Sequence, residues 1–129
     1  VEAPVSGSMI LAGVMLKLGG YGFFRSLSFL YCFLFNYGYF FMSLSLYGCL
    51  VISFFCLVQG DLSMLIAYSS VCHMGVVICG LFTLNMWGVL GSLIFMLGHG
   101  FVSSGLFFLV SIVFDRLGTR SFFLIKGLL

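Results

Sequence analysis

Charged residues are scarce in this sequence. Only 6% of the 129 residues are charged and 63% are hydrophobic, whereas a soluble domain has about 25% charged residues. So few charges cannot cover a surface that faces water, so we expect the chain to lie in a lipid bilayer. The net charge of +2 comes without a basic cluster, and nucleic acid is therefore not an expected partner.

The sequence also has little proline and no closely spaced cysteine pair. Its single proline, Pro4, can occupy the first turn of a helix. The five cysteines form no CxxC motif and are interpreted as small buried hydrophobic residues, so no metal site is predicted. No initiator methionine or basic leader precedes the opening VEAP. We therefore expect residues 1–129 to be one fragment of the transmembrane domain of a longer protein.

Long apolar segments predict an all-α membrane protein with a bundle of about four transmembrane helices. Each reaches the roughly 20 residues that a helix needs to cross the hydrocarbon, and none alternates in polarity as barrel strands do. The predicted spans are residues 5–25, 37–58, 62–83 and 88–114. Residues 115–129, which include Lys126, are predicted to form an interfacial tail.

Polar residues separate the predicted spans. Asn36, Tyr37 and Gly38 form the expected first turn, residues 59–61 the second and residues 85–88 the third. Asp61 is well placed to cap the helix that follows it. Four crossings put both ends of the chain on one side of the membrane, together with the basic residues of the tail. The positive-inside rule assigns that side to the matrix or cytoplasm.

Three ionisable residues fall near the middle of these spans. Lys17 lies about 18 Å along the first span, at 1.5 Å per residue. His73 and His99 lie roughly 17 Å along the third and fourth spans, so all three share one depth. A charge in hydrocarbon is costly and rarely kept without a partner or a hydrated cavity. A row at one depth is what a lateral proton path needs.

Other interpretations of these three residues compete with a lateral proton relay. Lys17 can belong to a buried ion pair, and an intramembrane histidine can be a helix–helix hydrogen-bonding contact. His73 and His99, on consecutive antiparallel helices, also suit two axial ligands of a b-type haem. Several hydroxyl residues either support water chains between the ionisable groups or bond their own backbones. They are Tyr68, Ser69, Ser70, Ser103 and Ser104.

Three stretches carry a resemblance to a known family: VEAPVSGSMILAGVMLKLGGYGFFR, DLSMLIAYSSVCHMG and GSLIFMLGHGFVSSGLFFL. Together they resemble the antiporter-like membrane subunits of NADH:ubiquinone oxidoreductase, the mitochondrial respiratory complex I, which are related to Mrp-type cation/proton antiporters. The resemblance covers almost the whole chain and is weakest over residues 26–58. It implies a fold with inverted repeats, of which this chain holds the eighth to eleventh helices.

The resemblance also implies roles for individual residues. Lys17 matches the central lysine of the eighth helix, and His73 and His99 match the histidines of the tenth and eleventh helices, which together form a proton relay. Two departures stand out. Ser63 replaces a lysine that usually follows Asp-Leu, and Phe114-Asp115-Arg116 replaces Tyr-Glu-Arg.

The function implied by the resemblance is that of a translocase subunit. The chain would be part of a proton-pumping, multi-pass subunit of the mitochondrial inner membrane and of the respiratory electron-transport chain. Its partners would be other membrane-arm subunits and the bilayer. NADH and ubiquinone would be substrates of the whole complex, with no cofactor or redox centre in this chain. An Mrp-type antiporter subunit and a bis-His haem b membrane protein remain the alternatives.

Overall fold

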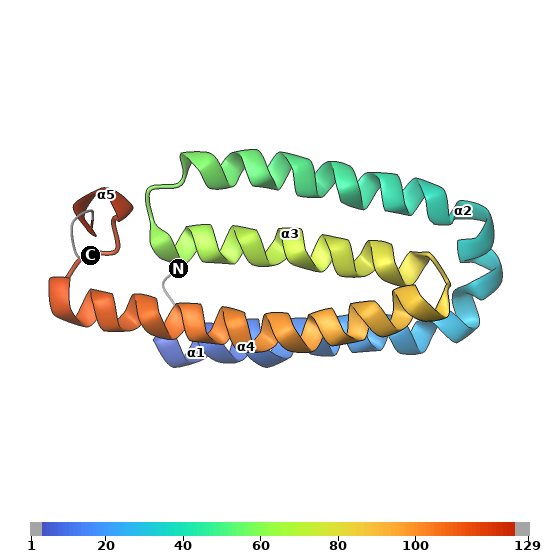
Figure 1. The fold of residues 1–129 in the computed structure, drawn as a ribbon, viewed down its shortest axis with the longest axis horizontal. Helices are drawn as coiled ribbons and strands as arrows, with labels where there is room; N and C mark the ends of the chain where they lie inside the picture. The colour runs from blue at the N-terminus through green and yellow to red at the C-terminus, as the bar shows by residue number, and fades with distance from the viewer. Residues whose placement is uncertain (1–3, 126–129) are drawn as a thin grey trace.

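The computed structural model describes residues 4–125, and the part of the tail that contains Lys126 lies outside them. The described chain is helical almost throughout (Figure 1). Its elements are α1 (Val5–Ile10), the π-helix η1 (Leu11–Met15), α2 (Leu16–Val58), α3 (Leu62–Phe82), α4 (Met86–Leu117) and α5 (Phe122–Ile125). The predicted all-α class is confirmed, since residues 4–125 contain only an isolated bridge between Asp61 and Ser121 and no strand.

Three of the described helices are long and apolar enough to cross a membrane. They span Ser6–Val58, Leu62–Phe82 and Met86–Leu117. The first has 53 residues, and a straight helix of that length would measure about 80 Å, against a hydrocarbon core of about 30 Å. A straight path is therefore incompatible with the bilayer.

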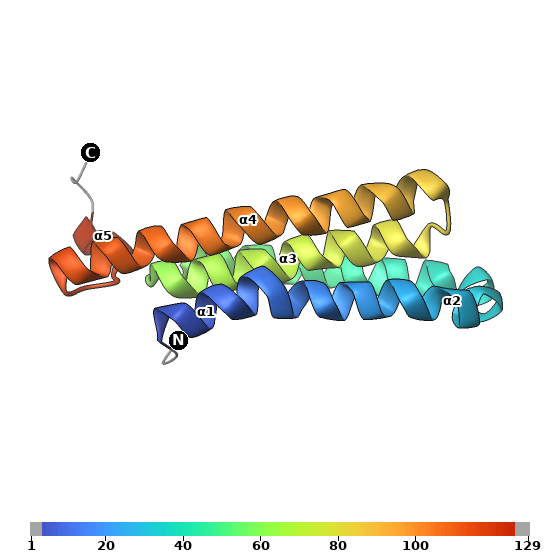
Figure 2. The ribbon, with the colours of Figure 1, turned by 90° about the horizontal axis from the view of Figure 1, so that it is seen from below.

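The long helix instead reverses its direction and packs on α3 with both halves (Figures 1 and 2). In its first half, the Phe23 ring lies 5.3 Å from the Phe82 ring. In its second half, Phe41 stacks on the same ring at 5.8 Å. Cys49 then contacts Cys72, further back along α3. We call residues 16–27 the outgoing limb of α2 and residues 41–58 its return limb.

The reversal corrects the prediction of an open turn at Asn36, Tyr37 and Gly38. All three residues are helical, and Leu34 and Gly38 are buried on the inner side of the bend. The backbone of Phe82 lies next to Gly38, 3.8 Å from where a β-carbon on that glycine would be. Helical hydrogen bonds keep the backbone satisfied close to the hydrocarbon, where an open turn would leave polar groups unpaired.

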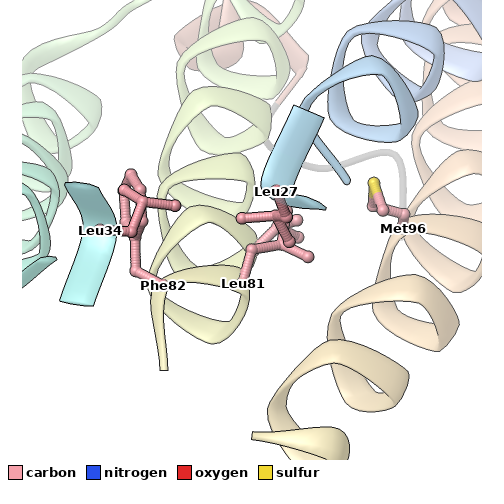
Figure 3. Close-up of a cluster of buried hydrophobic side chains, with 6 residues drawn as sticks. Leu27, Leu34, Leu81, Phe82 and Met96 are labelled. Atoms are coloured by element: carbon pink, nitrogen blue, oxygen red, sulfur yellow. The ribbon is translucent and has the colours of Figure 1, made fainter. Parts of the chain in front are cut away.

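A small apolar core forms where the bend meets α3 and α4. Leu27 and Leu34 from α2 pack with Leu81 and Phe82 from α3 and with Met96 from α4 (Figure 3). Leu81 is fully buried in this cluster. Most large apolar side chains outside this cluster are exposed, as expected for helices whose surroundings are lipid or other helices.

The helix ends differ in detail from the predicted boundaries. Asp61 stands at the N-cap of α3, but its side chain makes no capping hydrogen bond. Its segment is instead tied by backbone bonds, from Leu62 N to Arg120 O at 3.2 Å and from Phe122 N to Gly60 O at 2.7 Å. At the other end of the bundle, α4 begins at Met86, two residues earlier than predicted. It runs to Leu117, so the start of the predicted tail belongs to this helix.

Different connections and helix termini lie at the two ends of the bundle. The α2–α3 connection lies near α1 and α5 at one end, and the bend of α2 lies with the α3–α4 connection at the other (Figure 1). Gly118 closes α4 in the left-handed conformation, with φ of 67°, and its N–H donates to Phe114 O at 2.8 Å. Arg120 then lies 4.4 Å from the centroid of the Phe114 ring. The end that holds Arg116 and Arg120 is therefore also the end where the tail begins. We call it the basic end.

Candidate functional site

A local change of helix type holds Lys17. Residues Leu11–Met15 form a π-helix, in which the backbone turn is wider than in an α-helix. The Lys17 ammonium donates to the carbonyl oxygen of Ala12, five residues earlier. Ala12 is buried. The wider turn therefore supplies a buried acceptor to a lysine that has no carboxylate partner among the contacts seen in residues 4–125.

His99 is the second polar partner of Lys17. Its Nδ1 lies 3.1 Å from Lys17 Nζ, and it comes from α4, 82 residues along the chain. Since an ammonium group is only a donor, Nδ1 is the acceptor while Lys17 is charged, and the neutral imidazole then carries its proton on Nε2. The two residues are both partly buried.

His73, on α3, lies next to His99. The centroid of its ring lies 5.4 Å from that of His99, with the ring planes inclined at 57°. It also packs against Phe95 at 5.8 Å, and its side chain is exposed on the outside of the described bundle. The structure therefore brings the three predicted site residues into one chain of neighbours, Lys17 to His99 to His73. Their function stays a prediction.

Close backbone packing surrounds this polar contact. A β-carbon on Gly100 would lie 3.3 Å from Gly13 O and 3.3 Å from Lys17 Cε, so the absence of a side chain at Gly100 makes room for the lysine. The hydroxyl of Ser103, which is buried, has two acceptors for its one hydrogen, Gly100 O at 3.3 Å and Ala12 O at 3.5 Å. We call Ala12, Lys17, His99 and Ser103 the polar junction.

Two cavities flank the polar junction. One has a volume of about 550 Å³ and is lined by Lys17, Gly100 and Ser104 among other residues. The second, of about 190 Å³, touches Ala12 and runs toward the basic end of the bundle. Its polar lining consists of Ser8, Ser63, Ser70, Ser111 and Arg120. Most of the residues that line both cavities are apolar, so the junction lies between two largely apolar spaces.

The second cavity is lined by Ser63, whose hydroxyl group is buried. Its hydroxyl oxygen is buried and makes no hydrogen bond within the described part of the chain. A buried hydroxyl without a protein partner is commonly satisfied by water. The position at which Ser63 replaces the lysine of the resembling family therefore lines a cavity.

Most of the hydroxyl groups considered from the sequence bond their own helix. Ser69 donates to Ile66 O, Ser70 to Ala67 O and Ser104 to Phe101 O. Ser103, in contrast, also bonds to another helix, at Ala12 O. The backbone carbonyl of Ala12 is the member of the site that sequence reasoning missed, because no sequence signal marks a π-helix in an apolar run.

The described residues hold no group of three or more histidine, cysteine, aspartate or glutamate side chains arranged to bind a metal ion. The two histidines therefore have no third protein ligand of these types within residues 4–125. Lys17 already occupies His99 Nδ1.

A family model described as NADH:quinone oxidoreductase/Mrp antiporter, transmembrane, matches residues 1–129. The match covers the whole sequence, including the weakly resembling stretch over residues 26–58.

Individual relatives are similar over the same range. The sequence is 57% identical to NADH-ubiquinone oxidoreductase chain 4 of Locusta migratoria over 129 residues, which cover 100% of this chain and 29% of the relative. It is 59% identical to the protein of the same name from Ceratitis capitata, with the same coverage. For that of Petromyzon marinus the identity is 48% over 128 residues, or 99% of this chain and 28% of the relative. The chain spans less than a third of these curated relatives.

Proposed function

The chain belongs to the NADH:quinone oxidoreductase/Mrp antiporter transmembrane family, and on this premise we propose that it is part of a proton-translocating subunit of NADH:ubiquinone oxidoreductase in the mitochondrial inner membrane. The names of its relatives support this member of the family. The whole complex would oxidise NADH with ubiquinone and couple that reaction to proton pumping. This chain would carry protons and perform no redox step.

The observation that carries the proposal is the contact between Lys17 Nζ and His99 Nδ1 at 3.1 Å. When Lys17 is charged, two acceptors stabilise it, the Ala12 carbonyl and the imidazole. When the ammonium gives its proton to Nδ1, the imidazole becomes a cation that carries a second proton on Nε2. An imidazole can therefore take up a proton at one nitrogen and release one at the other.

His73 is the next group that such a proton would reach. Its ring lies 5.4 Å from the His99 ring by centroid, a separation that one hydrogen bond or one intervening water spans. His73 is exposed on the described bundle, so it would pass the proton onward to a neighbouring helix of the longer protein. The direction of travel across the bundle is thus from α2 through α4 to α3, or the reverse.

Conformational change elsewhere in the complex would drive the relay by altering the surroundings of Lys17. A lysine suits this role because desolvation makes its proton easier to exchange. The cavity beside Lys17 Nζ, of about 550 Å³, offers a place where hydration can differ between states. Partners that cover this cavity would be other membrane-arm subunits or other helices of the same subunit.

Substitution of Lys17 tests the proposal. We expect Lys17→Ala in the full-length subunit to lower both proton pumping and the NADH oxidation that is coupled to it. Pumping is measured as acidification in sealed vesicles, and turnover as NADH consumption with a quinone acceptor. A Lys17→Ala enzyme that assembles and pumps at the normal rate would rule out this role for Lys17.

Two alternatives have their own tests. An Mrp-type antiporter would transport sodium without complex I partners, so sodium-dependent proton exchange by the isolated full-length protein would favour it. A bis-His haem b protein would show a Soret band after purification. We expect neither signal, because the relatives in this family are named as oxidoreductase subunits and because Lys17 holds His99 at its Nδ1.

A further inference from the structure

The return limb of α2 meets α3 through a pair of cysteines. Cys49 Sγ donates to Cys72 O at 3.3 Å, and Cys72 Sγ donates to Cys49 O at 3.4 Å. Each sulfur therefore reaches the backbone of the other residue, and the two cysteines face each other at one level of the helix pair. Both are partly buried and both are free thiols.

Gly75 allows this close approach. A β-carbon at Gly75 would overlap the Cys49 sulfur and would lie 3.7 Å from Ser45 O. Gly75 stands three residues after Cys72, and residues with this spacing share one face of a helix. The glycine thus brings the two backbones together beside the thiols. A disulfide needs such proximity, because its Cα atoms are separated by about 4.4–6.8 Å.

The surroundings decide which oxidation chemistry is open to the pair. Leu50 and Val71, the sequence neighbours of Cys49 and Cys72, are exposed on the apolar surface of the described bundle, which acyl chains or other apolar helices would cover. A thiolate is disfavoured in hydrocarbon, so reactions that require a thiolate are suppressed there. Removal of a hydrogen atom from a neutral thiol requires no charge separation. The oxidants of this kind in a membrane are lipid peroxyl radicals.

We propose that Cys49 and Cys72 form a dithiol site that reacts with lipid peroxyl radicals and closes to a disulfide. Each peroxyl radical takes one hydrogen atom from an S–H bond and becomes a lipid hydroperoxide. The two sulfur radicals then pair to form the S–S bond. Two thiols and two peroxyl radicals thus give one disulfide and two hydroperoxides, with no proton or electron left over. The bond would tie the return limb of α2 to α3.

Cys79 provides an internal contrast in the same helix pair. Its sulfur lies 2.9 Å from the Ser45 hydroxyl, which itself donates to Met42 O at 2.9 Å. Cys79 therefore lies at the same interface between α2 and α3, where it contacts the Ser45 hydroxyl. A hydroxyl cannot form a disulfide, and reciprocal sulfur–carbonyl contacts join Cys49 to Cys72, so linkage of that pair is the expected outcome.

The experiment uses the full-length subunit in its complex, in vesicles that contain polyunsaturated lipid. A lipid-soluble azo initiator generates peroxyl radicals, and remaining thiols are then alkylated under denaturing conditions. Mass spectrometry without reduction should find a linked Cys49–Cys72 peptide and the loss of two alkylatable thiols per subunit. A phosphine reductant should restore both thiols. Cys79 should remain alkylatable.

Variants separate the pair from general oxidation. Cys49→Ser and Cys72→Ser should each abolish the linked peptide. Ser45→Cys should add a second linked pair with Cys79, which checks that the helix pair has the described geometry. Recovery of both Cys49 and Cys72 as free thiols while lipid hydroperoxides accumulate would overturn the proposal, as would linkage of either residue to a different cysteine. The linkage is measured without reference to pumping, so it stands or falls independently of the proposed function.

Discussion

The polar junction and the cysteine pair are both close contacts between helices that meet next to a glycine, yet they hold different chemistry. At the polar junction, Gly100 leaves room for a charged lysine, and a π-helix supplies the Ala12 carbonyl as an acceptor. At the cysteine pair, Gly75 leaves room for a neutral thiol, and the acceptors are ordinary helical carbonyls.

The difference shows what a charge requires of its surroundings in a membrane. A hydrogen bond to a charged group is worth about 1.5–3 kcal/mol, whereas a typical neutral one contributes about 1 kcal/mol. Lys17 has two such acceptors on different helices, Ala12 O and His99 Nδ1. A cysteine needs none, because an unpaired thiol costs little. We therefore expect changes at the junction to act mainly on function, and changes at the cysteine pair to act mainly on packing.

The largest effect is expected from Lys17→Arg. Arginine keeps the positive charge and its donors but does not release its proton in proteins. The subunit should assemble, while pumping should fall by about a hundredfold, at the low end of what proton transfer by a positioned group contributes. Assembly is followed by native gel and pumping by vesicle acidification. Normal pumping with arginine would mean that the charge at this position is structural.

His99→Gln should have the next largest effect. Glutamine can present an oxygen to Lys17 in place of Nδ1 but cannot take up a proton and release another. We expect pumping to fall by about tenfold, less than the roughly hundredfold low end for a general acid–base group, with assembly retained. His99→Phe is the matched variant, since it also removes the acceptor. If His99→Gln pumps normally and His99→Phe does not, the histidine only holds Lys17 in place.

Gly100→Ala should have a moderate effect at the junction. The new β-carbon would lie 3.3 Å from both Gly13 O and Lys17 Cε, so Lys17 or the backbone must move by a few tenths of an ångström. We expect pumping to fall by severalfold with a small loss of thermal stability, because donor–acceptor geometry is sensitive to such shifts. The two quantities are measured as vesicle acidification and as the midpoint of thermal inactivation.

Gly75→Ala makes the same change at the cysteine pair and should have the smallest effect on function. Its β-carbon would meet the Cys49 sulfur, which can rotate away at a packing cost of about 1–3 kcal/mol for an overfilled contact. We expect a lower inactivation midpoint, weaker Cys49–Cys72 linkage and pumping close to normal. A larger pumping loss for Gly75→Ala than for Gly100→Ala would contradict the division between the two regions.

Some of the site was readable from residue spacing. Counting residues along each apolar run put Lys17, His73 and His99 at one depth, because the rise of an α-helix is nearly constant. Counting could not tell which faces of the helices meet. Lys17 contacts His99 directly and reaches His73 only through His99. The reason is that α4 packs both on α3 and on the start of the long helix, at α1 and η1. The chain does reverse near Asn36 to Gly38, where a turn was predicted, but these residues remain helical.

Composition and the lengths of the apolar runs are enough to predict a membrane environment, an all-α class and a common depth for the ionisable groups. These follow from the scarcity of charge and from the length of the apolar runs, which act residue by residue. The tertiary structure decided the partners of Lys17. The Ala12 carbonyl in the π-helix accepts from Lys17, Gly100 leaves room for the lysine, and the His99 imidazole comes from α4, 82 residues along the chain. Such contacts depend on which helix faces meet, and in an almost uniformly apolar chain the pattern of side chains carries little information about those faces.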